Sequence, residues 1–143
     1  MLIVRLSEEN AYDYEEYLGT DLCQELERKF YRGIVAIDDE SGEPAGGIVY
    51  ELHNLETEDK DTVSRIEWFR EDVEGAGKEI LDAYTEMIRK EGAVQSLFAI
   101  PVDRQRPERR ILKAAGFTSK LYEGDDIFVT MEQMEKMPIM KKR

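Results

Sequence analysis

Glu67 and Tyr122 are the side chains of this sequence whose types best suit proton transfer. Glu67 lies within Thr62–Phe69, a run rich in β-branched and aromatic residues that predicts a strand. A carboxylate on a strand beside a cleft can accept a proton, and a phenol can donate one to a leaving group. The alternatives are a solvent-facing Glu67 and an ordinary packing role for Tyr122. The chemistry open to this pair is therefore general acid–base catalysis.

Cys23 and His53 are reactive residue types without the neighbours that their chemistry needs. A nucleophilic cysteine needs an adjacent base or a cationic setting, and Cys23 falls on the apolar side of a predicted helix. His53 has no second histidine, cysteine or suitably spaced acid beside it to complete a metal site. The acidic runs 38–43 and 56–61 lack the ligand spacing of a calcium loop. We therefore expect no metal, a buried Cys23 and a surface His53.

The charge balance excludes several classes of partner. The 143-residue chain has 32 acidic against 20 basic residues, which gives a formal net charge of -12. This charge repels phosphate backbones and anionic lipids, so we expect neither nucleic acid nor membrane as a partner. An acidic surface would instead attract a small cationic amine or a basic peptide. The single cysteine, the lack of a leader pattern and the lack of an apolar run of ~20 residues predict a cytoplasmic protein.

The elements that must position these side chains begin with a strand and two helices. Leu2–Leu6 has the pattern of a strand, and Ser7, followed by two glutamates, predicts a helix N-terminus. The capping pattern that starts at Asp21 predicts a second helix, which should continue through Phe30 and end at Gly33.

An antiparallel hairpin and a third strand should follow. The runs 34–37 and 45–52 flank a turn-rich segment, which predicts the hairpin. Simple alternation along the strand Thr62–Phe69 then predicts one face made of Ser64, Ile66 and Trp68 and another made of Val63, Arg65, Glu67 and Phe69.

The second half of the chain predicts two helices, a buried strand and a final hairpin. Apolar residues recur at helical spacing from Gly75 to Gly92. The uninterrupted apolar run 97–100 predicts a central strand, parallel to the strand before the helix. The segment 107–116 predicts a short helix bounded by proline and glycine, and 122–129 predicts a hairpin. We therefore expect a single mixed α/β (α+β) domain over 1–136, a mostly antiparallel sheet flanked by helices, with the remaining residues, 137–143, as a tail.

The order of these elements resembles the GCN5-related N-acetyltransferase (GNAT) family over nearly the whole chain. The segments that carry the resemblance are Ile-Glu-Trp-Phe at 66–69, Gly-Ala-Gly-Lys at 75–78 and Leu-Lys-Ala-Ala-Gly-Phe at 112–117. The resemblance implies acetyl-coenzyme A as co-substrate. It also implies direct attack of a primary amine on the acetyl thioester.

The resemblance further implies roles for particular residues. Glu67 would be the general base, and Tyr122 would protonate the departing thiolate. Apart from the resemblance, an exposed strand after Phe117 would allow pairing between subunits in a homodimer. The cofactor-binding residues would be Phe69 in the cofactor slot and, as a phosphate cradle at a helix N-terminus, Gly75, Ala76, Gly77 and Lys78.

Two positions depart from the family pattern. Asp72 stands where the loop usually has Arg or Gln, and Leu112 stands where the family often has a tyrosine acid. A carboxylate ~5 Å from a phosphate costs roughly 1 to 3 kcal/mol, whereas a helix N-terminus contributes about 0.3 to 1 kcal/mol. Inward-facing acids among Glu71, Asp72 and Glu74 would therefore offset the helix, while outward-facing ones would be screened by salt. The alternative function is a non-catalytic GNAT-like interaction or regulatory module that has lost coenzyme A binding.

Overall fold

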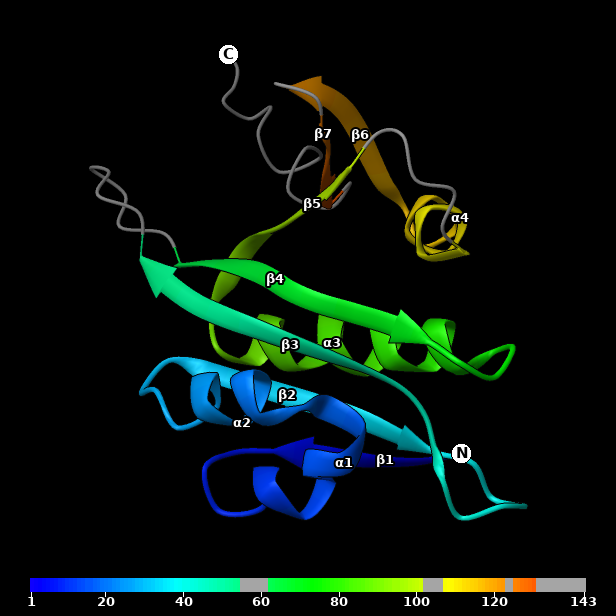
Figure 1. Cartoon of the computed structure of the whole chain (residues 1–143). Helices are drawn as coiled ribbons and strands as arrows, with labels where there is room; N and C mark the ends of the chain where they lie inside the picture. Colours follow the sequence, from blue (N-terminus) through cyan, green and yellow to red (C-terminus); the bar gives the residue numbers. More distant parts are fainter. Residues whose placement is uncertain (55–61, 102–106, 123–124, 131–143) are drawn as a thin grey trace.

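The structure, a computed structural model, describes residues 1–54, 62–101, 107–122 and 125–130. Its elements are, in chain order, β1 (Leu2–Leu6), η1 (Ala11–Tyr14), α1 (Glu15–Leu18), α2 (Thr20–Glu25), β2 (Tyr31–Ile37), β3 (Pro44–Asn54), β4 (Thr62–Glu71), α3 (Ala76–Lys90), β5 (Ala93–Pro101), α4 (Pro107–Ala114), β6 (Phe117–Tyr122) and β7 (Asp125–Thr130). The strands form one sheet in the order β1-β2-β3-β4-β5-β7-β6 (Figure 1).

The sheet confirms the predicted mixed α/β fold. The hairpin of β2 and β3 is antiparallel, as is the final hairpin of β6 and β7. β5 runs parallel to β4, as the helical crossover through α3 requires. No helix among the described residues is long and apolar enough to cross a membrane. The predicted tail, 137–143, lies outside the described residues.

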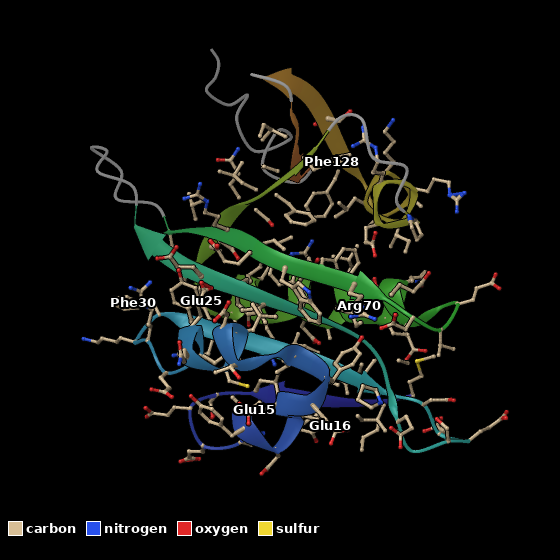
Figure 2. The ribbon with its side chains drawn as sticks, viewed as in Figure 1. Glu15, Glu16, Glu25, Phe30, Arg70 and Phe128 are labelled. Atoms are coloured by element: carbon tan, nitrogen blue, oxygen red, sulfur yellow. The ribbon has the colours of Figure 1, made fainter. Side chains whose placement is uncertain are left out.

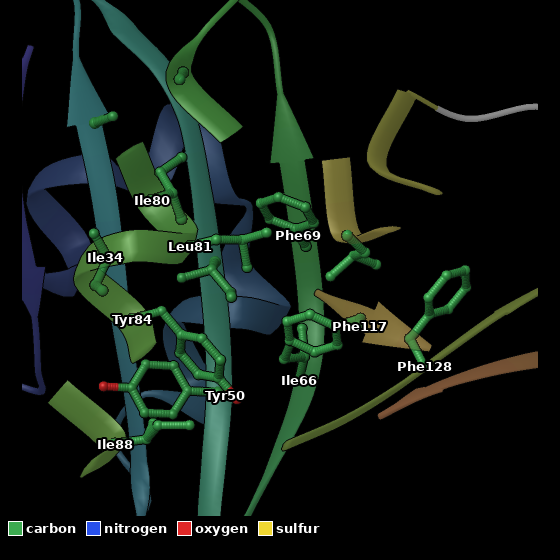
Figure 3. Packing of buried hydrophobic residues seen from close by; sticks show 14 of the residues in the cluster. Ile34, Tyr50, Ile66, Phe69, Ile80, Leu81, Tyr84, Ile88, Phe117 and Phe128 are labelled. Carbon is green, nitrogen blue, oxygen red and sulfur yellow. The ribbon is translucent and has the colours of Figure 1, made fainter. Parts of the chain in front are cut away.

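Two hydrophobic clusters lie on opposite faces of the sheet, because alternate residues of β2 and β3 point to opposite sides. Ile34 and Ile48 belong to the cluster under α3, whereas Val35 and Val49 belong to the cluster under α1 and α2. Figure 3 shows the first cluster, in which α3 packs its apolar stripe across the strands. Within it, the rings of Tyr50 and Tyr84 meet edge to face, with 4.8 Å between centroids. The first four strands therefore lie between α3 on one face and α1 and α2 on the other.

The predictions for the first two helices were wrong in their boundaries. The Asn10 side chain bonds the backbone at Ser7 and Arg5, so a turn and the 3-10 helix η1 precede the short α1. The second helix ends at Glu25, and Phe30 is 54% exposed, at the edge of the molecule (Figure 2). Gly33 lies within β2, where a Cβ would approach Leu6 Cδ1 and the Ile48 carbonyl oxygen at 3.1 Å each. It therefore serves close packing rather than helix termination.

A β-bulge in β4 corrects the predicted faces of that strand. Tyr50 of β3 pairs with Ile66, but the preceding Val49 pairs with Trp68, so Glu67 is the extra residue. Ile66 accordingly belongs to the cluster under α3, and Trp68 packs on the opposite cluster. Simple alternation had placed both on one face. Glu67, the extra residue, lines the gap beside β5.

β4 and β5 pair over only part of their lengths. Their register runs from Thr62 opposite Ala93 to Arg65 opposite Leu97, after which β5 pairs with β7. Just before this divergence, the Tyr84 hydroxyl of α3 hydrogen-bonds both Ser64 on β4 and Ser96 on β5. Figure 1 shows β5, β6, β7 and α4 turning away from the first four strands. The sheet thus opens at one defined point.

Candidate functional site

A cleft of about 330 Å³ lies where β4 and β5 separate. Strand divergence creates it, because the backbone edges of β4 and β5 no longer approach each other beyond Arg65 and Leu97. Most of the lining is apolar, with one carboxylate and one guanidinium. The lining residues are Arg65, Ile66, Glu67, Leu97, Phe98, Ala99 and Ile127.

Glu67 is the carboxylate on the wall of this cleft. Its side chain is 29% exposed, and Oε2 lies 4.0 Å from Nε of Arg65, whose side chain is 63% exposed. An exposed pair at this distance contributes about 0 to 1 kcal/mol, so it orients Glu67 only weakly. A carboxylate at the edge of an apolar cleft can accept a proton from a bound ammonium group. Its assignment as a base stays a prediction.

The N-terminus of α3 carries an internal anion. Gly75 is the N-cap residue, with φ of 95°, a left-handed conformation that glycine adopts without strain. Oε2 of Glu71 accepts hydrogen bonds from the backbone N–H of Gly75 at 3.1 Å and of Gly77 at 2.8 Å. The intervening Ala76 N–H donates to the Val73 carbonyl at 3.0 Å. Glu71 therefore occupies the place where a helix N-terminus would bind a phosphate.

Gly77 and α4 shape the surroundings of the Glu71 carboxylate. A Cβ at Gly77 would lie 3.1 Å from Oε2 of Glu71 and 2.7 Å from Cδ1 of Ile111 on α4. Oε2 of Glu108, also on α4, accepts the backbone N–H of Glu71 at 3.3 Å, and Glu108 is 6% exposed. The start of α3 thus contacts the side chain of Glu71, and α4 contacts its backbone.

Asp72 points away from the start of α3. Its carboxylate accepts hydrogen bonds from the Tyr17 hydroxyl and from Nε of Arg70, the latter at 2.9 Å. The Arg70 guanidinium lies 5.3 Å from the centre of the Tyr17 ring, and that ring meets Trp68 edge to face at 6.0 Å. Figure 2 shows Arg70 near the end of β4. Burial and the hydrogen bond to Asp72 raise the pKa of Tyr17, so its phenol stays protonated at neutral pH.

The other predicted cofactor residues have separate environments. Lys78 forms an exposed ion pair with Asp82, 2.9 Å away and one helical turn along α3. Phe69 is 2% exposed, belongs to the core cluster under α3 and does not line the cleft. The structure therefore brings Gly75, Ala76, Gly77 and Lys78 together at one turn, but not Phe69 with the cleft. Their roles in binding stay predictions.

The remaining candidates are Tyr122, His53, Leu112 and Cys23. Tyr122 ends β6, but its side chain and that of His53 lie outside the described residues. Leu112 is fully buried on α4, and a leucine there has no proton to give. Cys23 is fully buried and donates to the Ala11 carbonyl, which confirms its prediction as a small core residue. No group of potential metal ligands occurs among the residues that the structure describes.

The position of Glu71 and the contribution of Glu108 were not predicted from the sequence. Glu71 was recognised as a nearby charge, not as the acceptor for two amides. A signal was present, since an acid four residues before the N-cap glycine can fold back across a tight turn. Glu108, in the first turn of α4, resembled an ordinary helix-start acid.

No protein-family model matches this sequence, and no curated protein matches it. The structure of Arabidopsis thaliana NAA60 in complex with acetyl-CoA aligns with a TM-score of 0.67 at 10% identity, over 90% of this chain and 96% of that one. A ribosomal-protein-alanine N-acetyltransferase from Brucella melitensis biovar Abortus 2308 aligns with a TM-score of 0.64 at 11% identity, over 86% and 99%.

A third solved structure, assigned to the GNAT family of acetyltransferases, comes from Desulfovibrio desulfuricans. It aligns with a TM-score of 0.62 at 18% identity, over 90% of this chain and 95% of that one. Identities this low establish the fold alone. The chain has the GNAT fold, which confirms the resemblance predicted from the order of its elements.

Proposed function

We propose that this protein transfers an acetyl group from acetyl-coenzyme A to a primary amine bound at the cleft between β4 and β5. The observation that carries the proposal is the open cleft with Glu67 on its wall, at the point where a GNAT-fold sheet separates. The similar NAA60 structure, which contains acetyl-CoA, supports the choice of co-substrate.

In this proposal the chain contributes acid–base chemistry and orientation. Glu67 accepts the proton of the substrate ammonium, so that the nitrogen has a free electron pair. Acetyl-coenzyme A, when bound, would supply the activated thioester, whose C–S bond would break as the C–N bond forms. Tyr122 is the proposed donor of a proton to the departing sulfur, and the second proton that the nitrogen loses would restore the phenol. The apolar walls of Phe98 and Ile127 reduce the water around the reacting groups.

The charge of the chain suggests the class of acceptor. A formal net charge of -12 raises the local concentration of cations near the surface. A small cationic amine or a basic peptide is therefore the proposed acceptor. A homodimer through the edge strand β6 and a cytoplasmic location belong to the same proposal.

The start of α3 does not fit a pyrophosphate in the state seen here. Two of the amide groups that would hold it already donate to Glu71. This contact favours a second candidate function, a non-catalytic interaction or regulatory module of the same fold. Leu112 also favours this non-catalytic module, because a buried leucine replaces the acid that the family often has.

Titration calorimetry with acetyl-coenzyme A, followed by an acetylation assay on a panel of amines, separates the two functions. An acetyltransferase should bind the ligand at micromolar to sub-millimolar concentration and give acetylated amine detectable by mass spectrometry. Binding of neither ligand nor amine at millimolar concentration would favour the non-catalytic module. The same panel should contain polyamines and basic peptides, with neutral amides as negative controls.

A further inference from the structure

Glu71 is positioned as a competitor for any anionic ligand of α3. Its single Oε2 atom accepts from both Gly75 and Gly77, at 3.1 Å and 2.8 Å. These two N–H groups lie at the positive end of a 15-residue helix and point to one position. A phosphate oxygen that used the same two donors would have to take the place of the carboxylate oxygen.

The two anions cannot share the site. The surroundings of Gly77 are tight, because an added Cβ would lie 3.1 Å from Oε2 and 2.7 Å from Ile111 Cδ1. A carboxylate and a phosphate at this separation would also repel each other. Binding of a diphosphate therefore requires Glu71 to leave the amides.

The backbone of Glu71 can stay in place while its side chain leaves. The residue pairs with Gly46 across the sheet, and its N–H donates to Glu108 at 3.3 Å. Both contacts involve main-chain atoms, so rotation of the side chain alone breaks the contacts of Oε2 with α3. Glu71 is half-buried, which gives the rotated carboxylate access to water.

We propose that Glu71 is an autoinhibitory anion, which holds the diphosphate position of α3 closed in the free protein and must be displaced when coenzyme A binds. The proposal rests on the function proposed above for the identity of the ligand. The measured affinity for a diphosphate is then the intrinsic affinity reduced by the fraction of molecules in which Glu71 has rotated away. Removing the Glu71 carboxylate should raise the affinity for a diphosphate and leave the cleft between β4 and β5 unchanged.

Calorimetric titration of three variants with inorganic pyrophosphate and with coenzyme A tests this. Glu71→Ala empties the position, and Glu71→Gln keeps the side-chain volume but removes the charge. Glu74→Gln is the matched control, because Glu74 is an exposed acid in the same turn. We expect Glu71→Ala to bind both probes about tenfold tighter or more than the wild type, since two charge-assisted hydrogen bonds no longer compete. Glu71→Gln should be intermediate, and Glu74→Gln should change affinity by less than about twofold because its charge is screened.

Equal affinities for Glu71→Ala and Glu74→Gln would overturn the proposal, as would the absence of pyrophosphate binding to every variant. If Glu71→Ala does not fold, the comparison of Glu71→Gln with Glu74→Gln decides in the same way. Acetyl transfer is read separately. If the Glu71 variants bind pyrophosphate and coenzyme A more tightly but no form transfers acetyl groups, Glu71 is autoinhibitory and the protein is not an acetyltransferase. If the wild type transfers acetyl groups but the Glu71 variants bind both probes as the wild type does, the protein is an acetyltransferase and Glu71 is not autoinhibitory.

Discussion

The cleft between β4 and β5 and the start of α3 are two parts of one candidate site, and they differ in state. The cleft is open, with about 330 Å³ of space and a partly exposed Glu67 on its wall. The start of α3 is closed by Glu71, which accepts from Gly75 and Gly77. The first part depends on how backbones separate, whereas the second depends on one side chain.

This difference shows which features of a site depend on the backbone and which depend on individual side chains. The separation of β4 from β5 in this chain is a property of strand register, which the backbone sets. The availability of amides at a helix start depends on which side chain reaches them first. Fold similarity at 10 to 18% identity therefore does not determine which side chain lies at the start of α3.

The largest expected effect concerns the open cleft. Glu67→Gln removes the proposed base, so kcat/KM for acetyl transfer should fall by roughly 10² to 10⁴. The affinity for acetyl-coenzyme A should stay within about twofold, because the cleft wall keeps its shape. Steady-state acetylation assays over a pH series measure the effect.

The control for that experiment is Glu86→Gln, which removes an exposed carboxylate on α3 with the same change in net charge. It should leave kcat/KM unchanged. If Glu67→Gln and Glu86→Gln gave the same kcat/KM, Glu67 would have no role in proton transfer. The cleft would then not be a catalytic site, in contrast to what its open state suggests.

A second prediction tests α4, the helix that packs beside the start of α3. Leu112 is fully buried on α4, the helix that also carries Glu108 and Ile111 beside Glu71. Leu112→Ala should lower the free energy of unfolding by about 2 to 5 kcal/mol, from lost burial and the cavity left behind. Urea unfolding measures it, with the exposed Lys113→Ala expected within about 0.5 kcal/mol of wild type. A tolerated Leu112→Ala would contradict its place in the core.

A third prediction concerns the seam, which we define as Tyr84, Ser64 and Ser96 at the point where β4 and β5 begin to separate. Tyr84 hydrogen-bonds Ser64 and Ser96 where β4 and β5 are still paired. Tyr84→Phe leaves two buried serine hydroxyls short of a partner and should cost about 1 to 3 kcal/mol of unfolding free energy. Tyr12→Phe is the matched control, because Tyr12 is exposed and bonds only a surface glutamate in the described structure. Equal losses in the two variants would argue against a special role for the seam.

The smallest effect is a pH dependence of the same seam. Burial raises the pKa of Tyr84 above its ordinary value of 10.0. Below about pH 10 the tyrosine is protonated in both states, so its contribution to stability is fully present. At higher pH the unfolded chain loses the proton first, and stability falls by at most about 1.4 kcal/mol per pH unit for this group. The melting temperature of the wild type should therefore drop more steeply than that of Tyr84→Phe above about pH 10.

Most of the fold was predictable because its signals are local. The hairpin of β2 and β3, the long helix α3 and the parallel β5 follow from periodicity, turn residues and crossover rules. The errors fall where side chains or neighbouring strands override those signals. Asn10 diverts the first helix into a turn, and close packing against Leu6 and Ile48 places Gly33 inside a strand.

The candidate site divides in the same way. The sequence by itself determined that a glycine-rich turn with three nearby acids would begin α3, and that Glu67 would lie on the strand before it. Only the tertiary structure decided that Glu71 turns onto the amides while Asp72 turns toward Tyr17 and Arg70. The physical reason is that strand and helix periods are set by the backbone, whereas the direction of a carboxylate depends on donors that distant segments supply.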